Sequence, residues 1–208
     1  DRDEASIIGR DTYMNDDPSI ASQITRLRGL DPQPDALYMC SVMPGGGSAI
    51  RQIRAAGIDL PILGCTAMVD NFWLGAVPGL TDFWVPGFMS LYGDDPREEI
   101  HAFLADYEER WGEAPGSSYV INGYSMVEAY ELAVSRAESV EAPAVTAAME
   151  AFTDEQFLAG PSTYTPEVHI LLDRPYLMMN VVDDSFRAVE IFRPTLIPDT
   201  QLLFRIGQ

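Results

Sequence analysis

The sequence contains no lysine, only two histidines and two cysteines, and no long apolar run. Its 13 basic residues, all of them arginines, stand against 32 Asp and Glu residues, so the formal net charge is −19. A field of that sign repels phosphate backbones and anionic lipid surfaces, which argues against nucleic acid as a partner. No stretch approaches the roughly 20 apolar residues of a membrane-spanning helix. The charged start, Asp1 to Glu4, does not fit a signal peptide either.

The scarcity of cysteine and histidine limits metal and nucleophilic chemistry. Cys40 and Cys65 are too few for a disulfide scaffold and match no zinc motif, and His101 and His169 lie in no metal-ligand spacing. Each cysteine ends a predicted strand, and consecutive strands are usually neighbours, so the two are expected to lie close together. Three alternatives stay open: buried free thiols, which are favoured because free cysteines usually act as small hydrophobes, a disulfide, or a nucleophile with a histidine base. Both histidines are expected to be structural.

The first 65 residues alternate short apolar runs with amphipathic stretches, which predicts βαβ units and a parallel sheet covered by helices. Strands are expected over residues 5–9, 35–40 and 60–65, and helices over residues 17–29 and 44–57. An open parallel sheet binds ligands beyond the carboxyl ends of its strands. Any site is therefore expected in the turns that follow Gly9, Cys40 and Cys65.

The rest of the chain is richer in helix and then in strand. A short helix is expected over residues 67–74, and a strand over residues 81–88 that Pro86 restricts to an edge or a crossing segment. Longer helices are expected over 96–111, 118–137 and 143–152, and a hairpin of strands over 176–182 and 186–192. Parallel strands early and antiparallel strands late predict two subregions, with the chain crossing between them near residues 88–95 or 112–118.

A glycine run, Gly45 to Gly47, opens the second predicted helix and could present backbone N–H groups to an anion. It lacks the Lys-Ser/Thr of a phosphate loop and the spacing of a dinucleotide motif. An ordinary helix start is favoured, with a site for a small carboxylate or polar ligand as the alternative. The paired aspartates at 16–17, 94–95 and 183–184 fall at turns, where Asp is expected for capping. No catalytic residue is predicted from them.

Several segments together resemble a known family. Five of them occur in the order and spacing of the periplasmic binding proteins of branched-chain amino acid (Leu/Ile/Val-type) ABC transporters: DDPSIASQITRL (16–27), PDALYM (34–39), IRQIRAAGIDLPILG (50–64), YEERWG (107–112) with Pro115, and GYSMVEAYELAVSRA (123–137). Gly160-Pro161 and the hairpin around residues 183–186 resemble the C-terminal part of that family. The resemblance extends from residue 11 to about residue 192. It implies an α/β fold, a type I periplasmic binding protein with flavodoxin- or Rossmann-like parallel sheet lobes, incomplete and with a C-terminal β hairpin.

Members of this family have two lobes that close on a small solute, deliver it to a membrane permease and catalyse nothing. The resemblance implies the extracytoplasmic solute-binding subunit of an ABC importer, located in the periplasm or outside the cell, without cofactor or metal. It assigns residues 1–92 to most of lobe 2, 93–117 to a helix and crossing, 118–155 to helices of lobe 1, and 156–208 to a β-rich return and C-terminal crossing. The first lobe would precede Asp1. The helices after Ser118 are therefore expected to need a missing N-terminal lobe, or a second copy of the chain, to cover their apolar faces.

The resemblance also places the ligand contacts in the turns after the second and third predicted strands. These contacts are Cys40, Ser41, Val42, Met43, Cys65, Thr66, Met68 and Asp70. Many amino-acid-binding members carry an aromatic residue in the first turn and an acid in the second, which pairs with the ligand ammonium. Residues 40–43 and 65–68 contain neither, and a buried ammonium without a counter-charge is costly. A hydrophobic amino acid is therefore expected as the solute only if Asp70 supplies the counter-charge for its ammonium group. The alternative solutes are an amide, urea or a small organic acid.

Two other functions stay open at this point. The same clamp serves as the ligand-binding sensor domain of some receptors. A hydrolase that uses Cys40 or Cys65 as its nucleophile is a further alternative, and rapid alkylation of a thiol at neutral pH would favour it.

Overall fold

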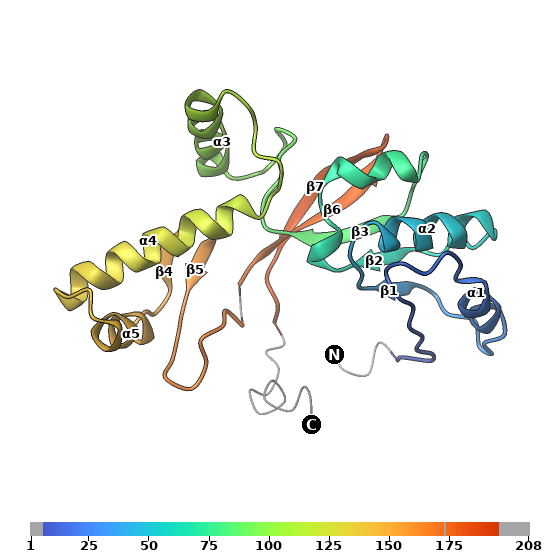
Figure 1. Ribbon diagram of the computed structural model, residues 1–208, viewed down its shortest axis with the longest axis horizontal. Helices are drawn as coiled ribbons and strands as arrows, with labels where there is room; N and C mark the ends of the chain where they lie inside the picture. The colour runs from blue at the N-terminus through green and yellow to red at the C-terminus, as the bar shows by residue number, and fades with distance from the viewer. Residues whose placement is uncertain (1–5, 173, 196–208) are drawn as a thin grey trace. The chain divides into compact units, whose positions relative to one another are not determined.

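The computed structural model describes residues 6–172 and 174–195, and it divides into two compact units (Figure 1). Of these residues, the first unit holds 6–87 together with Met178–Val189. The second holds 88–172, 174–177 and 190–195. Which unit corresponds to which lobe stays a prediction.

The first unit is built on a five-stranded sheet with strand order β1-β2-β3-β6-β7. The strands β1 (Leu37–Met39), β2 (Ile62–Gly64) and β3 (Phe83–Gly87) run parallel, with Met39 opposite Gly64 and Ile62 opposite Phe83. The strands β6 (Tyr176–Val182) and β7 (Ser185–Phe192) form the C-terminal hairpin. The predicted α/β fold class with a C-terminal hairpin is confirmed.

Helices cover one face of this sheet (Figure 1). They are α1 (Ala21–Arg28), α2 (Gly45–Ala55) and two 3₁₀ segments, η1 (Thr66–Met68) and η2 (Asn71–Ala76). Helix α2 buries Ile50 and Ile53, which are three residues apart on its apolar stripe, as its spacing predicts. The opposite face of the sheet is open, because Tyr38 of β1 is 75% exposed and Leu63 of β2 is 41% exposed.

Several predicted elements of the first unit are wrong. Residues 6–9 form no strand. Helix α1 begins at Ala21 rather than at Pro18, because the Asp17 carboxylate accepts a hydrogen bond from the Met14 N–H (2.7 Å) and closes a turn instead of capping the helix. The strand with Pro86 lies inside the sheet, between β2 and β6, not at an edge. This strand, β3, pairs with β2 through Phe83 and Trp84. Pro86, which has no N–H to donate, lies beyond these pairs.

An aromatic cluster supports the segment between β2 and β3. The rings of Trp73, Phe83 and Phe186 meet edge to face, with centroids 5.3–6.2 Å apart. The buried Trp73 indole N–H donates to the Met68 carbonyl (3.0 Å). Asn71 donates to the Ser185 hydroxyl (2.9 Å), and its side-chain oxygen accepts the Phe186 N–H (3.0 Å). This segment is therefore tied both to the core and to the hairpin turn.

Replacement of Asn71 tests the tie to the hairpin. Asn71→Ala removes two hydrogen bonds and leaves the Phe186 N–H without its partner, so we expect a loss of about 1–3 kcal/mol in the free energy of unfolding. Urea denaturation followed by circular dichroism measures it. The matched control is Gln156→Ala, at an exposed position of the second unit, with an expected change of about 0.5 kcal/mol or less. Equal unfolding free energies of the two variants would contradict a stabilising role of the hydrogen bonds from Asn71 to the hairpin.

In the described part of the second unit there are three helices and a short antiparallel pair of strands. The helices are α3 (Glu98–Trp111), α4 (Val120–Ala137) and α5 (Ala142–Glu150), within two residues of their predicted ends. Gly112 ends α3 at φ +76°, the left-handed conformation that glycine adopts without strain. The strands β4 (Glu155–Phe157) and β5 (Gly160–Ser162) are not predicted from the sequence as separate strands.

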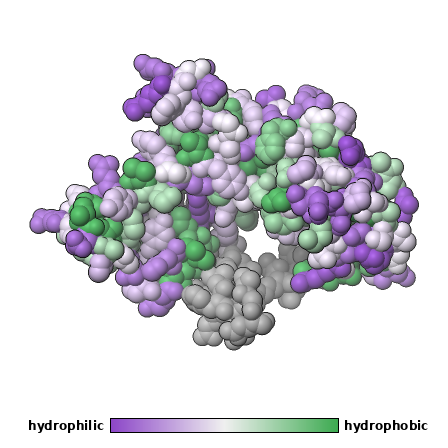
Figure 2. All heavy atoms as spheres, viewed as in Figure 1, coloured by the Kyte–Doolittle hydropathy of each residue, from purple (hydrophilic) through white to green (hydrophobic). Residues whose placement is uncertain are grey.

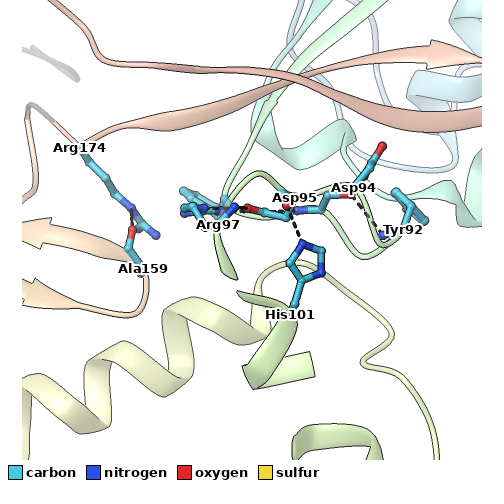
Figure 3. A network of polar contacts seen from close by, with 9 residues as sticks. Tyr92, Asp94, Asp95, Arg97, His101, Ala159 and Arg174 are labelled. Carbon is cyan, nitrogen blue, oxygen red and sulfur yellow. Dashed lines mark hydrogen bonds and ion pairs between the residues drawn. The ribbon is translucent and has the colours of Figure 1, made fainter. Parts of the chain in front are cut away.

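A buried ion pair fixes the first residues of the second unit (Figure 3). The Asp95 carboxylate, whose side chain is fully buried, accepts hydrogen bonds from the Arg97 guanidinium (2.8 and 2.9 Å) and from the Ser90 N–H (2.9 Å). Arg97 also donates to the Phe88 carbonyl (2.8 Å). His101 lies 2.7 Å from the Asp95 carbonyl through Nε2, which is the structural role expected of this histidine. These contacts span the residues that directly follow the boundary between the units.

The surroundings of Asp95 lower the pKa of its carboxyl group. Burial alone would raise the pKa of Asp95, but the hydrogen bonds from Arg97 and from the Ser90 N–H, together with the Arg97 charge, outweigh burial and hold the pKa below its ordinary value of 3.8. A depressed carboxyl pKa contributes stability above the ordinary value, and that contribution is lost as the pH falls through the lower pKa of the folded state. The ion pair therefore stabilises the unit at neutral pH, and this stabilisation is lost only in strong acid, where Asp95 becomes protonated.

Asp95→Asn should destabilise the protein by about 1.5–3 kcal/mol at pH 7, because it removes the charge that accepts hydrogen bonds from the partly buried Arg97 guanidinium. The difference in unfolding free energy between wild type and variant should shrink as the pH falls below about 4. Urea denaturation over a pH series measures both effects. Asp106→Asn removes an exposed pair with Arg110 and is the control, expected to cost about 0.5 kcal/mol or less. A difference that stays constant with pH would contradict the assignment.

Candidate functional site

The carboxyl ends of β1 and β2 bring two loops of the first unit together. In-register pairing puts Met39 directly opposite Gly64, so the chain leaves both strands at the same edge of the sheet. The Cys65 N–H donates to the Met39 carbonyl (3.2 Å) and extends the pairing by one residue. We call residues 40–44 the first loop and residues 65–70 the second loop. The structure brings together the two turns in which the site is predicted, and their role in binding stays a prediction.

A disulfide joins the two loops. Cys40 and Cys65 are bonded, with their Cα atoms 4.9 Å apart. The favoured interpretation, two buried free thiols, is therefore wrong: the parallel register places the residues after Met39 and Gly64 side by side, and Cys40 is exposed rather than buried. The hydrolase alternative loses its nucleophile as well, because a disulfide sulfur is not a thiolate.

The remaining predicted contact residues differ in exposure. Val42 is 54% exposed, and Ser41, Met43 and Thr66 are half-buried. Met68 is fully buried, and Asp70 is 5% exposed. The loop surface is thus made by residues 40–44 and 65–67, whereas Met68 is buried beneath it.

Asp70 has an unusual backbone. It adopts φ +83° and ψ +146°, a region that residues other than glycine rarely occupy, and it separates η1 from η2, so the helix predicted over residues 67–74 is interrupted there. Strained residues of this kind persist only where their surroundings hold them, and they cluster at functional sites. Its buried carboxyl group is the one acidic side chain of the second loop.

The glycine run starts helix α2, as the favoured interpretation predicts, and close packing explains it. A Cβ atom on Gly45 would lie 2.8 Å from the Asn15 Cα, and the Asn15 side-chain oxygen accepts the Gly45 N–H (2.9 Å). A Cβ atom on Gly46 would lie 3.1 Å from the Met68 methyl group. Glycine is needed because the first turn of α2 packs directly on Asn15 and Met68.

The loop surface carries no charge and no catalytic group. Residues 40–48 and 65–69 contain no acidic, basic or histidine side chain. They offer the hydroxyl groups of Ser41 and Thr66, backbone groups, and the apolar surfaces of Val42 and Met43. Within the described residues, no group of three His, Cys, Asp or Glu side chains could hold a metal ion. This surface can bind a solute through hydrogen bonds and apolar contacts, but it has no base or nucleophile.

The second unit holds a separate cavity of about 510 Å³ between α4, α5 and the β4–β5 pair, which the sequence does not signal. His169 lines it, and its Nε2 atom lies 2.9 Å from a carboxylate oxygen of Glu150 at the surface. Arg174 also lines it, stacks on the Phe88 ring (4.4 Å to the centroid) and donates to the Ala159 carbonyl (3.3 Å; Figure 3). Burial lowers the pKa of Arg174.

Helix α4 presents an apolar face beside this cavity. Met126 is 67% exposed, Val127 66%, and Tyr124 and Tyr130 49% each. Hydrophobic surface over this part of the second unit is visible in green in Figure 2. The expectation that the helices after Ser118 carry uncovered apolar faces agrees with these exposures.

Comparison with known proteins identifies a family. A family model described as "Periplasmic binding protein" matches residues 3–185. No curated protein matches the chain. No helix within the described residues is both long and apolar enough to span a membrane.

Solved structures share the fold at low sequence identity. The isoleucine complex of the branched-chain amino acid substrate-binding protein LivJ from Streptococcus pneumoniae is 17% identical, with a TM-score of 0.67 over 88% of this chain and 51% of its own. A leucine-binding protein from Thermotoga maritima is also 17% identical, with a TM-score of 0.71 over 88% and 51%. A solute-binding protein of an ABC transporter from R. palustris in complex with benzoate is 17% identical, with a TM-score of 0.64 over 88% and 49%. The chain thus spans about half the length of these structures.

The disulfide predicts a thiol count and a stability. Denatured, unreduced protein should contain no free thiol, and reduced protein two, measured by reaction with a chromogenic disulfide. Replacement of both cysteines by serine should lower the unfolding free energy by about 2–4 kcal/mol, because the crosslink closes a loop with a sequence separation of 25 residues. Two thiols in unreduced protein would contradict the disulfide.

Proposed function

Because the chain belongs to the periplasmic binding protein family, we propose that it is part of the extracytoplasmic solute-binding subunit of an ABC importer and holds a small organic solute at the first and second loops. The observation that supports this best is the register of β1 and β2, which delivers both loops to one edge of the sheet. Binding is the whole mechanism, and the family is one of binding proteins rather than enzymes.

In this proposal the hydroxyl groups of Ser41 and Thr66 form hydrogen bonds with the polar part of the solute. Val42, Met43 and the disulfide between Cys40 and Cys65 contact its apolar part. Met68 supports the second loop from below, and its complete burial supports that assignment. Asp70 lies at the end of the loop and is the one candidate partner there for a solute ammonium group.

The absence of charged side chains from residues 40–48 and 65–69 bears on the choice of solute. A zwitterionic amino acid brings an ammonium group whose burial is costly without a counter-charge, and Asp70 is itself only 5% exposed. A small organic acid, an amide or urea has no such group, so we propose a solute of this class ahead of a Leu/Ile/Val-type amino acid. The structural relatives include one in complex with benzoate and one in complex with isoleucine, so the composition of the loops carries this choice.

A complementary surface completes the proposed site. The open face of the sheet in the first unit and the exposed face of α4 in the second are apolar areas that do not persist uncovered in water. We propose that an N-terminal lobe or a second copy of the chain covers them and that the assembly delivers the solute to a membrane permease.

A thermal-shift screen with benzoate, L-isoleucine, L-leucine and urea tests the proposal. A solute present at about 100 times its Kd should add about 2.7 kcal/mol to the stability and raise Tm measurably. Native mass spectrometry of protein purified without added solute should reveal any molecule already bound.

Loop variants locate the binding. Thr66→Val and Ser41→Ala each remove one hydrogen-bonding hydroxyl from the loops, so each should weaken binding of the stabilising solute about tenfold, as measured by isothermal titration calorimetry. Ser22→Ala in α1 removes an exposed hydroxyl remote from the loops in the sequence and should leave the Kd unchanged. Unchanged affinity in both loop variants would contradict the proposed site.

A further inference from the structure

We propose that the Cys40–Cys65 disulfide is a redox-sensitive positioning element of the solute site: it holds the first loop against the second, and its reduction releases the first loop and weakens solute binding. The part of this proposal that concerns solute binding rests on the proposed function. The part that concerns the position of the first loop rests only on contacts within the first unit.

The two loops are anchored unequally. The second loop begins with the Cys65 N–H bonded to the Met39 carbonyl, and the Met68 carbonyl accepts the buried Trp73 indole N–H. Asn71, which follows directly, is bonded to Ser185 and Phe186 of the hairpin. Removal of the disulfide would leave all these contacts in place, so the second loop should keep its conformation.

The first loop has fewer hydrogen bonds to the sheet and to the hairpin than the second loop. Ser41 contacts the carbonyl of its own neighbour, Val42, at 3.4 Å, and Val42 is 54% exposed. The next firm anchors begin where the chain enters α2, with the Gly46 N–H donating to the Val42 carbonyl (2.9 Å) and Asn15 bound to Gly45. The Ser41 and Met43 side chains also lie beside Gly46 in the first turn of α2, so residues 40–43 are held on the α2 side by packing and on the side of the second loop by the disulfide, their one covalent link to it.

The disulfide is open to a reductant, because Cys40 is exposed and Cys65 half-buried. A dithiothreitol thiolate attacks one sulfur, breaks the S–S bond and forms a mixed disulfide with that cysteine. The second dithiothreitol thiol then displaces the cysteine and closes a cyclic disulfide. The two cysteines together gain two electrons and two protons, and dithiothreitol loses them. Oxidising compartments outside the cytosol keep such a bond formed, in line with the proposed location.

Hydrogen–deuterium exchange with mass spectrometry tests the anchoring. We expect exchange in residues 40–43 to rise about tenfold or more on reduction, whereas exchange in residues 66–76 changes less than about threefold. Reoxidation with oxidised glutathione should restore the original rates. The Cys40→Ser/Cys65→Ser double variant should show the fast rates with or without dithiothreitol, which separates loss of the bond from any other effect of the reductant.

Calorimetric titrations with benzoate and L-isoleucine test the consequence for binding. The solute that binds the oxidised protein should bind the reduced protein and the double variant about fivefold or more weakly, and reoxidation should restore the affinity of the wild type only. Circular dichroism at the same temperature confirms that all forms are folded.

Three results of these experiments would count against the proposals. Unchanged exchange in residues 40–43, or an equal rise in both loops, overturns the proposal. The expected exchange with equal solute affinity in both redox forms also overturns it. Failure of both probes to bind either form counts against the proposed function, and the exchange result then decides by itself whether the disulfide positions the first loop.

Discussion

The parallel pairing of β1 with β2 is the constraint on which the site depends. A one-residue slip of that register would move Cys40 away from Cys65 and send the loop side chains to the other face of the sheet. With Met39 opposite Gly64, the disulfide forms, both loops start at the same edge, and α2 begins close enough to pack on Met68. Neither loop needs a special sequence motif for this arrangement, because the sheet supplies the geometry.

The loops differ chemically from the protein around them. A chain with a net charge of −19 has an uncharged surface at residues 40–48 and 65–69, where hydroxyl groups, backbone groups and apolar side chains are close together. Such a surface suits the recognition of a small, partly apolar molecule, since no charge has to be desolvated on the protein side. The disulfide, the buried Trp73 and the close packing at the glycines of α2 fix the conformation of this surface. Less conformational entropy is then lost when a solute binds.

Much of the fold could be predicted from local signals. Helical periodicity and the capping Gly112 located α3, the pattern of residues 118–137 located α4, alternation located the hairpin, and family resemblance pointed to the two loops. Predictions failed where a distant contact overrides the local signal. Asp17 closes a turn instead of capping a helix, and the strand containing Pro86 lies inside the sheet because the hairpin strand β6 adds to its far side. The burial of Met68 could not be predicted either, since it depends on how closely Gly46 approaches.

Amide chemical-shift mapping by NMR tests the central claim most directly, with benzoate and L-isoleucine titrated into the oxidised protein. The account predicts that the largest shift changes fall on residues 40–46 and 65–70. Largest changes around the α4–α5 cavity, at Asn122 and Tyr164, with the loop amides unmoved, would contradict it.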